Sequence, residues 1–213
     1  MDVAIKNNYR KMFAEGVIIP ILEYNLNEID LITWAKSTFG IMELQNLHQL
    51  PDPIVFASYV DRLYYRVNQL KQNVEEIRQA CTTIKEEILV PLFGEIQKFQ
   101  FPPSIRCHLS GARTASAFHK DGDPKYGVTP GTLNLWIPLT RVSGNNSIYT
   151  ETTCDAGNYK AITLNPGEML VFDAFNLKHG SYQNDTTVSR VSIDIRFVPK
   201  DTTIARELGL YAK

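Results

Sequence analysis

The spacing of hydrophobic and polar residues changes near the middle of the chain. In the first half, apolar positions recur every three or four residues, which is typical of helices that bury one face. From residue 102 onward, apolar and polar positions alternate in short segments separated by turn residues, which is typical of strands. The pattern therefore predicts a helical first half followed by a β-rich second half.

Two helices are expected in the first half. Residues 27–39 form a short amphipathic segment, with Asn27 as its N-cap and Gly40 as its stop. A longer heptad-like stripe covers 60–88, and Pro91 is expected to end that helix. The stripe suits either a coiled coil that dimerises the protein or a helix laid across a sheet, and its mixed flanking charges favour the sheet. Its members are Val60, Leu63, Val67, Leu70, Val74, Ile77, Cys81, Ile84 and Ile88.

The second half predicts several strands. Residues 131–140 alternate, and 168–174 and 188–198 are two further strands, with turns at 143–146 and 165–167. This order of elements predicts an α+β protein, a double-stranded β-helix (jelly roll) with the N-terminal helices packed outside the barrel. We expect a single domain over 1–213, with 1–100 as mainly helical support and 101–200 as the jelly-roll catalytic core. In the first strand, Leu133, Leu135, Ile137 and Leu139 share one face, and Thr132, Asn134 and Trp136 share the other.

Composition excludes several classes of partner. The net charge is -1, from 22 basic and 23 acidic residues, so the chain lacks the basic excess of a nucleic-acid-binding protein. No apolar stretch is long enough to span a bilayer, and the N-terminus lacks the apolar core of a signal peptide. The 3 cysteines form no CxxC pair and suit reduced thiols. We therefore expect a cytoplasmic protein with a small-molecule substrate and no nucleic-acid or membrane partner.

Candidate metal ligands lie in the β-rich half. His119 and Asp121 are two residues apart, so in an extended segment they point to the same side. His179 follows a later strand, and the adjacent Gly180 allows close approach of backbone. Two histidines and one carboxylate on one face of a metal, with the other positions open, are the ligand set of non-haem Fe(II) oxygenases. By contrast, we expect His108 to be a hydrogen-bonded core residue or part of a pocket lining.

The last strand carries a second candidate feature. Arg190, Ser192, Asp194 and Arg196 share one face, opposite four apolar residues. One interpretation is a solvated edge strand with an ion pair between Asp194 and Arg196. The other is a polar cavity in which Arg190 and Ser192 bind the distal carboxylate of 2-oxoglutarate, because a guanidinium pairs with a carboxylate through two hydrogen bonds.

At these residues the chain resembles the Fe(II)/2-oxoglutarate-dependent oxygenases, most closely the phytanoyl-CoA dioxygenase-like group. The resemblance covers about residues 101–199 and is carried by FHKD at 118–121, NLWIPL at 134–139, PGEMLVF at 166–172, HGSYQN at 179–184 and RVS at 190–192. It implies that His119, Asp121 and His179 bind iron and that Arg190 anchors 2-oxoglutarate. It also implies that Trp136 borders the cosubstrate, and we expect Ser192 and Asn134 to help bind it.

The resemblance leaves the substrate open. Where many relatives carry a Pro-Gly-Ser-His-like stretch, this chain has NSIYTET at 146–152. Halogenating relatives replace the metal-binding carboxylate with a small residue, so Asp121 implies oxygen insertion by O2. The polarity of several residues near the site indicates a small polar metabolite, and the Gly- and Pro-containing loop 122–131 is either a lid or a plain connector. These candidate substrate contacts are Arg106, Arg113, Tyr126, Tyr149 and Glu151.

Two alternatives to this hydroxylase remain at this point. A cupin-type metal enzyme would use the same barrel and metal without 2-oxoglutarate, and would not need Arg190. A non-catalytic assembly protein would instead form a homodimer through the 60–88 helix. Dependence of turnover on 2-oxoglutarate distinguishes the proposed hydroxylase from the cupin-type enzyme. Metal content and mass in solution distinguish it from the assembly protein.

Overall fold

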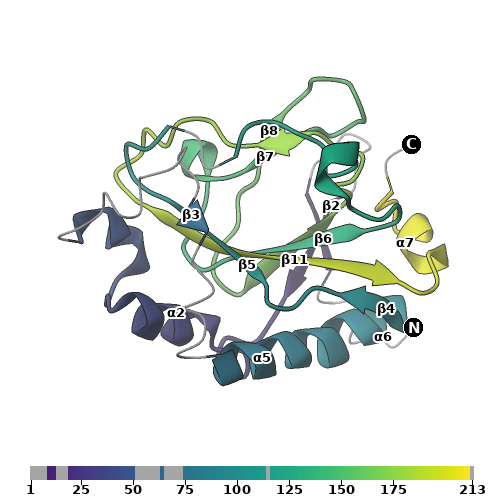
Figure 1. Cartoon of the computed structure of the whole chain (residues 1–213), viewed down its shortest axis with the longest axis horizontal. Helices are drawn as coiled ribbons and strands as arrows, with labels where there is room; N and C mark the ends of the chain where they lie inside the picture. Colours follow the sequence, from purple (N-terminus) through teal and green to yellow (C-terminus); the bar gives the residue numbers. More distant parts are fainter. Residues whose placement is uncertain (1–8, 13–18, 51–62, 65–73, 114–115, 212–213) are drawn as a thin grey trace.

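Two antiparallel sheets build the core of the protein, whose computed structural model describes residues 9–12, 19–50, 63–64, 74–113 and 116–211 (Figure 1). The larger sheet has the strand order β1-β2-β9-β6-β11-β5-β3, and β4 also pairs with β11. Its strands are β1 Tyr9–Met12, β2 Ile19–Glu23, β3 Leu63–Tyr64, β4 Ile96–Phe99, β5 Ser104–His108, β6 Leu133–Pro138, β9 Glu168–Phe172 and β11 Arg190–Pro199. The smaller sheet has the order β10-β7-β8, formed by β7 Tyr149–Thr150, β8 Lys160–Ala161 and β10 His179–Gly180.

The centre of the larger sheet follows the alternation of the sequence. Strands β6 and β11 pair from Leu133 opposite Phe197 to Pro138 opposite Ser192. The odd-numbered apolar residues of both strands enter one hydrophobic core, whereas Trp136 enters a second, smaller core on the other face. A one-residue slip would exchange these faces, so burial fixes the register. The polar face of β11 therefore lies on the side of Trp136, as the alternation predicted.

Helices cover the opposite face of the larger sheet (Figure 1). Helix α2 (Leu31–Phe39) ends at Gly40, which has a left-handed backbone with φ 64°, so the predicted stop is confirmed. The predicted start is wrong, because Asp30 rather than Asn27 is the N-cap and accepts a hydrogen bond from the Thr33 amide at 2.9 Å. Residues 25–27 instead form a turn in which the Asn25 side chain accepts the Asn27 amide.

Of the predicted 60–88 helix, the described residues show the part from Val74 onward. It runs through α5 (Val74–Thr83), η2 (Ile84–Leu89) and α6 (Val90–Phe93). Leu63 lies in strand β3, paired with Cys107 of β5, so the helical prediction is wrong there, and Val60, Val67 and Leu70 lie outside the described residues. Pairing with a distant strand has overridden a local periodicity. Where the stripe is described, Ile77, Cys81 and Ile84 are buried in the protein's own core, as expected for a helix laid across a sheet.

Pro91 does not end this helix, contrary to the prediction. The preceding turn, η2, is a π-helix, and the Val90 amide donates to the carbonyl of Lys85, five residues earlier. Such wide turns relieve crowding inside helices, and Pro91 then occupies the start of α6, where a missing amide proton is tolerated. The helix ends at Gly94 instead.

The first hundred residues contain more strand than predicted. Strands β1 and β2 form a hairpin, and β2 joins the larger sheet through Ile21, which lies opposite Leu170 of β9. Short apolar runs such as 17–22 cannot be assigned to helix or strand by periodicity alone, which explains the error. In the described part of the chain, no helix has the length and apolarity needed to cross a membrane. The single domain and the homodimer remain predictions.

Candidate metal centre and cosubstrate pocket

A two-residue bridge brings together histidines that are distant in sequence. The amides of His119 and His179 each donate to the other's carbonyl, and both hydrogen bonds measure 2.9 Å. The two imidazole centroids are 4.6 Å apart. His179 comes from β10 of the smaller sheet, whereas His119 lies outside the named strands. The backbone itself therefore sets the distance between the two rings.

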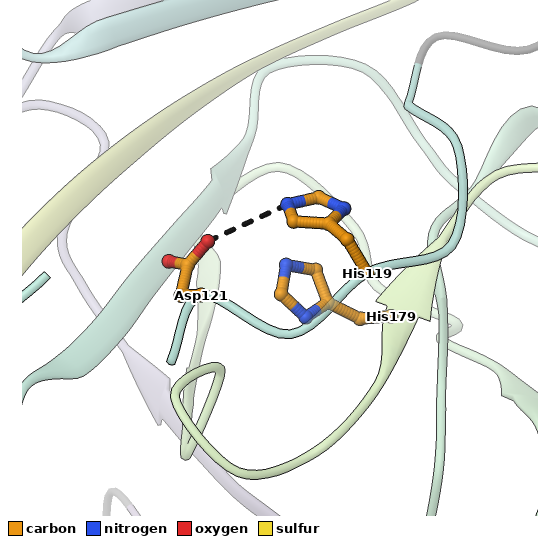
Figure 2. Close-up of side chains that lie close together, drawn as sticks. All are labelled: His119, Asp121 and His179. Carbon is orange, nitrogen blue, oxygen red and sulfur yellow. Dashed lines mark ion pairs between the residues drawn. The ribbon is translucent and has the colours of Figure 1, made fainter. Parts of the chain in front are cut away.

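Asp121 completes a cluster with these histidines (Figure 2). Its amide donates to the carbonyl of Ala174 at 2.8 Å, and the Gly122 amide donates to that of Phe175 at 3.0 Å, so backbone hydrogen bonds also fix this segment. One ligand atom from each of His119, Asp121 and His179 lies within 4.8 Å of the other two. The His119 Nε2 atom is 3.4 Å from Asp121 Oδ1, the pair joined by the dashed line in Figure 2.

Hydrogen bonds to backbone carbonyls orient both imidazoles. The Nδ1 atom of His119 lies 2.7 Å from the carbonyl of Ala117, and that of His179 lies 3.0 Å from the carbonyl of Leu177. A carbonyl oxygen only accepts hydrogen bonds, so we assign the ring proton to Nδ1 in both residues. This tautomer leaves both Nε2 lone pairs free to bind a cation, an arrangement typical of histidine metal ligands.

The charges of the cluster also suit a divalent cation. Burial lowers the pKa of His179 to about 4, so this imidazole is neutral near pH 7. Burial alone would raise the pKa of Asp121, but the adjacent His119 ring and the two hydrogen bonds from the Arg196 guanidinium outweigh it and hold the pKa well below its usual range. An anionic carboxylate and a neutral imidazole are the ligand forms that a divalent metal requires.

The ion pairs on β11 differ from the solvated-edge interpretation. Arg196 pairs with Asp121, through Nε to Oδ2 at 2.8 Å and Nη2 to Oδ1 at 3.0 Å. Asp194 pairs with Arg106 of the neighbouring strand β5, so no ion pair joins Asp194 to Arg196. The sequence placed Arg196 on the correct face, but gave no signal that its partner would be a candidate metal ligand.

The four predicted cosubstrate residues lie on the same face of the larger sheet, spread along β6 and β11. Arg190 and Ser192 are fully buried on β11, and Trp136 and Asn134 are buried on the adjacent β6. The Arg190 Cζ atom is 5.7 Å from the centroid of the Trp136 ring. Arg190 lies on the same face of β11 as Arg196, which contacts Asp121, so this group and the metal cluster share one side of the sheet.

Many polar atoms in this group are not hydrogen-bonded to any described residue. They are Nε and Nη2 of Arg190, Oγ of Ser192, Nε1 of Trp136 and Oδ1 of Asn134. The remaining contact of the guanidinium is a long 3.4 Å hydrogen bond from Nη1 to the carbonyl of Asn146. Burial lowers the pKa of Arg190 to about 10, which still leaves it charged near pH 7. A buried cation with unused donors requires an anion, and a carboxylate matches the geometry of a guanidinium.

Other predicted residues have mixed outcomes. His108 is buried, and its Nε2 atom is 3.0 Å from the carbonyl of Arg113, in agreement with the predicted hydrogen-bonded core residue. Glu151 was a candidate substrate contact, but its carboxylate instead accepts the amides of Lys178 and Gly157 at 2.8 and 3.0 Å. Glu151 therefore stabilises the backbone next to β10 through these hydrogen bonds. Tyr126 lies near the cluster, with its ring centroid 5.0 Å from that of His119.

The loop 122–131 borders the cluster. A surface hollow is lined by His119 and Lys178 together with Gly122, Asp123 and Lys125 of this loop. Residues 124–126 form a single 3-10 turn, capped by the Asp123 side chain. The position of the loop suits a cover over the site, and its movement as a lid remains a prediction.

Gly180 controls how closely the two histidine segments approach. A Cβ atom at Gly180 would lie 2.8 Å from the Cα and amide nitrogen of Phe118 and 2.9 Å from the carbonyl of Ser116, all of which are backbone atoms. Gly180→Ala is therefore expected to push the bridge apart and to weaken Co(II) binding at least about tenfold. Isothermal titration with Co(II) measures this. Met42→Ala is the control, because the Met42 side chain is 80% exposed, and equal affinities in both variants would contradict the expectation.

No family model matches this chain. It is 29% identical over 181 residues to the streptomycin biosynthesis protein StrG of Streptomyces griseus, and the match covers 85% of each chain. Among solved structures, HygX from Streptomyces hygroscopicus, crystallised with nickel and 2-oxoglutarate bound, superposes with a TM-score of 0.52 and 10% identity over 85% of this chain and 83% of that one. EvdMO1 superposes with a TM-score of 0.51 and 18% identity over 85% of this chain but only 47% of that one.

The structural comparisons bear on the fold, because the sequence identities are low. They confirm the predicted α+β double-stranded β-helix with helices outside the barrel. The cluster of His119, Asp121 and His179 lies in that fold at one side of the larger sheet. The chain therefore has the fold of HygX, which was crystallised with nickel and 2-oxoglutarate, together with a His-Asp-His cluster, in agreement with the fold and the cluster that the resemblance implied.

Proposed function

We propose that this protein is an Fe(II)- and 2-oxoglutarate-dependent oxygenase that uses O2 to hydroxylate a C–H bond of a small polar metabolite. The main support is that a His-Asp-His cluster and a buried guanidinium with unused donors lie on one side of the same sheet. A cupin-type enzyme that does not use 2-oxoglutarate would have no need for a buried cation at Arg190.

The residues present fit both groups. His119, Asp121 and His179 would hold the iron, since one ligand atom from each lies within 4.8 Å of the other two and both Nε2 lone pairs are free. Arg190 and Ser192 would bind the far carboxylate of 2-oxoglutarate, and Trp136 and Asn134 would border it. When bound, iron and 2-oxoglutarate supply the oxidising chemistry, with release of succinate and CO2.

The protein's own contribution is orientation and exclusion of water. The carbonyls of Ala117 and Leu177 fix the imidazole planes, and Arg196 fixes the carboxylate plane. Complete burial of Arg190 and Ser192 keeps bulk water from the far end of the pocket. The carboxylate at position 121 occupies the place that a halide needs in halogenating relatives, so hydroxylation is the proposed outcome.

The substrate class rests on the sequence relative. StrG is named a streptomycin biosynthesis protein, and we infer that this chain also acts on an intermediate of secondary metabolism. The test is a screen for succinate release with Fe(II), 2-oxoglutarate and ascorbate against aminocyclitols, amino sugars, nucleosides, amino acids and acyl carriers. The expected result is substrate-dependent succinate together with a product that gains one oxygen atom from labelled O2. Turnover that proceeds equally well without 2-oxoglutarate would contradict the proposal and favour the cupin-type enzyme.

A further inference from the structure

We propose that Arg196 is a positioning residue that keeps one carboxylate oxygen of Asp121 away from the metal, so that Asp121 binds through a single oxygen. This inference rests on the proposed function, because it concerns the same three-residue cluster. It assigns a role to Arg196, which lies on the same strand as Arg190 and hydrogen-bonds to Asp121.

The two oxygens of Asp121 have different surroundings. Oδ2 accepts a hydrogen bond from Arg196 Nε at 2.8 Å. Oδ1 accepts a longer one from Nη2 at 3.0 Å and also lies 3.4 Å from His119 Nε2. Oδ1 is therefore the oxygen on the imidazole side, whereas Oδ2 is taken by the shorter of the two guanidinium contacts. A cation bound by both imidazoles would meet Oδ1.

Hydrogen bonds and strand pairing fix the backbone of Arg196. Its amide donates to Oε1 of Gln100 at 3.1 Å, and its carbonyl accepts from the Gln100 amide at 2.8 Å. On its other side it lies opposite Asn134 of β6. The Asp121 side chain is only 3% exposed, whereas that of Arg196 is 35% exposed. The carboxylate is therefore buried against a guanidinium whose strand is fixed on both edges.

The number of bound oxygens matters because a three-ligand site has few open positions. A carboxylate that binds through both oxygens occupies one position more than a carboxylate that binds through one. 2-Oxoglutarate chelation and O2 need the positions that remain. The cationic Arg196 also opposes the approach of a metal ion through like-charge repulsion. Arg196 thus limits metal affinity while keeping coordination positions open for the cosubstrate.

The test uses Co(II) alone, followed by 2-oxoglutarate, on three proteins: wild type, Arg196→Met and Arg196→Lys. In Arg196→Met the Kd for Co(II) is expected to fall about three- to tenfold, because the repelling cation is lost and Oδ2 becomes available. The Kd of the Co(II)-loaded variant for 2-oxoglutarate is expected to rise about tenfold, the size of a lost contact to a ligating carboxylate. Arg196→Lys keeps the charge but lacks the planar fork that holds both carboxylate oxygens, so its Kd for Co(II) is expected to lie between those of the wild type and Arg196→Met.

The matched control is Arg206→Met, which removes an exposed arginine on α7 (Thr203–Glu207) and leaves both affinities unchanged. As a second readout, Co(II) is expected to raise the melting temperature of Arg196→Met more than that of wild type, because the metal then provides the counter-ion for a buried carboxylate. Co(II) affinity in Arg196→Met that is unchanged or weaker would overturn the positioning role, while the proposed function would stand. Failure of the wild type itself to bind Co(II) would instead refute the proposed function.

Discussion

Asp121→Ala is expected to weaken binding of Fe(II) or Co(II) by more than about 100-fold and to abolish substrate-dependent succinate release. The substitution removes the only anionic member of the cluster and leaves two neutral imidazoles. Isothermal titration with Co(II) measures the affinity, and succinate release measures the turnover. The fold should tolerate the change. Arg196 loses its ion-pair partner, but its side chain is 35% exposed and water can solvate it.

The matched control for this variant is Asp201→Ala. Asp201 is an exposed residue that accepts the Thr203 amide at 2.8 Å, far along the chain from the cluster, so its loss should leave metal binding unchanged. Metal-dependent turnover that survives in Asp121→Ala would show that the cluster is not the metal site. Equal loss in both variants would point to instability rather than to a missing ligand.

Arg190→Met is expected to weaken 2-oxoglutarate binding by about 100- to 1000-fold while leaving the Co(II) affinity within about twofold of wild type. The estimate is the loss of two charge-assisted hydrogen bonds, each contributing about 1.5–2 kcal/mol in a buried site. Titration of 2-oxoglutarate into the Co(II)-loaded protein measures it. Arg190→Lys should not restore binding, because an ammonium lacks the planar fork that matches a carboxylate.

The same variant has a second informative readout. Arg190 is fully buried and its Nε and Nη2 atoms have no described partner, so removing its charge should not lower the melting temperature of the ligand-free protein. A 2-oxoglutarate affinity within about threefold of wild type would mean that the guanidinium does not bind the cosubstrate. In that case the unused donors of Arg190 would have to serve another ligand.

The β-rich half was predictable because both of its faces are buried in different cores. The alternation along β6 and β11 assigned Leu135 and Ile193 to the helix-covered core and Trp136 and Arg190 to the other side. The turn residues at 143–146 and 165–167 separated the strands correctly. Residues that share a face of a central strand keep that relation in the fold, so periodicity placed Arg190 and Ser192 on one face, and the resemblance added Trp136 to them.

The first half was harder to predict, because tertiary pairing decides its structure. The stripe through 60–88 has helical spacing throughout, yet Leu63 pairs with β5 in the structure. Strand β2 is short and apolar, and it forms a strand because β9 offers a free edge beside it. Neither partner strand, β5 or β9, can be identified from the sequence next to Leu63 or to β2.

Within the site, ligand identity was easier to predict than ligand support. His119, Asp121 and His179 carry metal-binding chemistry in their side chains, so their types and order suggested the cluster. The groups that orient them are backbone carbonyls, such as those of Ala117 and Leu177, and any residue supplies a carbonyl. The same holds for the backbone hydrogen bonds between residues 121–122 and 174–175. The residue types in the sequence therefore do not identify the backbone groups that orient the metal ligands.

The unpaired polar atoms around Arg190 have a practical consequence for engineering. Each buried donor or acceptor without a partner destabilises the empty fold by about 1–3 kcal/mol. A redesign guided only by thermal tolerance would therefore choose Arg190, Ser192 and Asn134 for early replacement by hydrocarbon side chains of similar volume. The resulting protein would have a higher melting temperature, but it would also lose the polar groups that are proposed to bind 2-oxoglutarate.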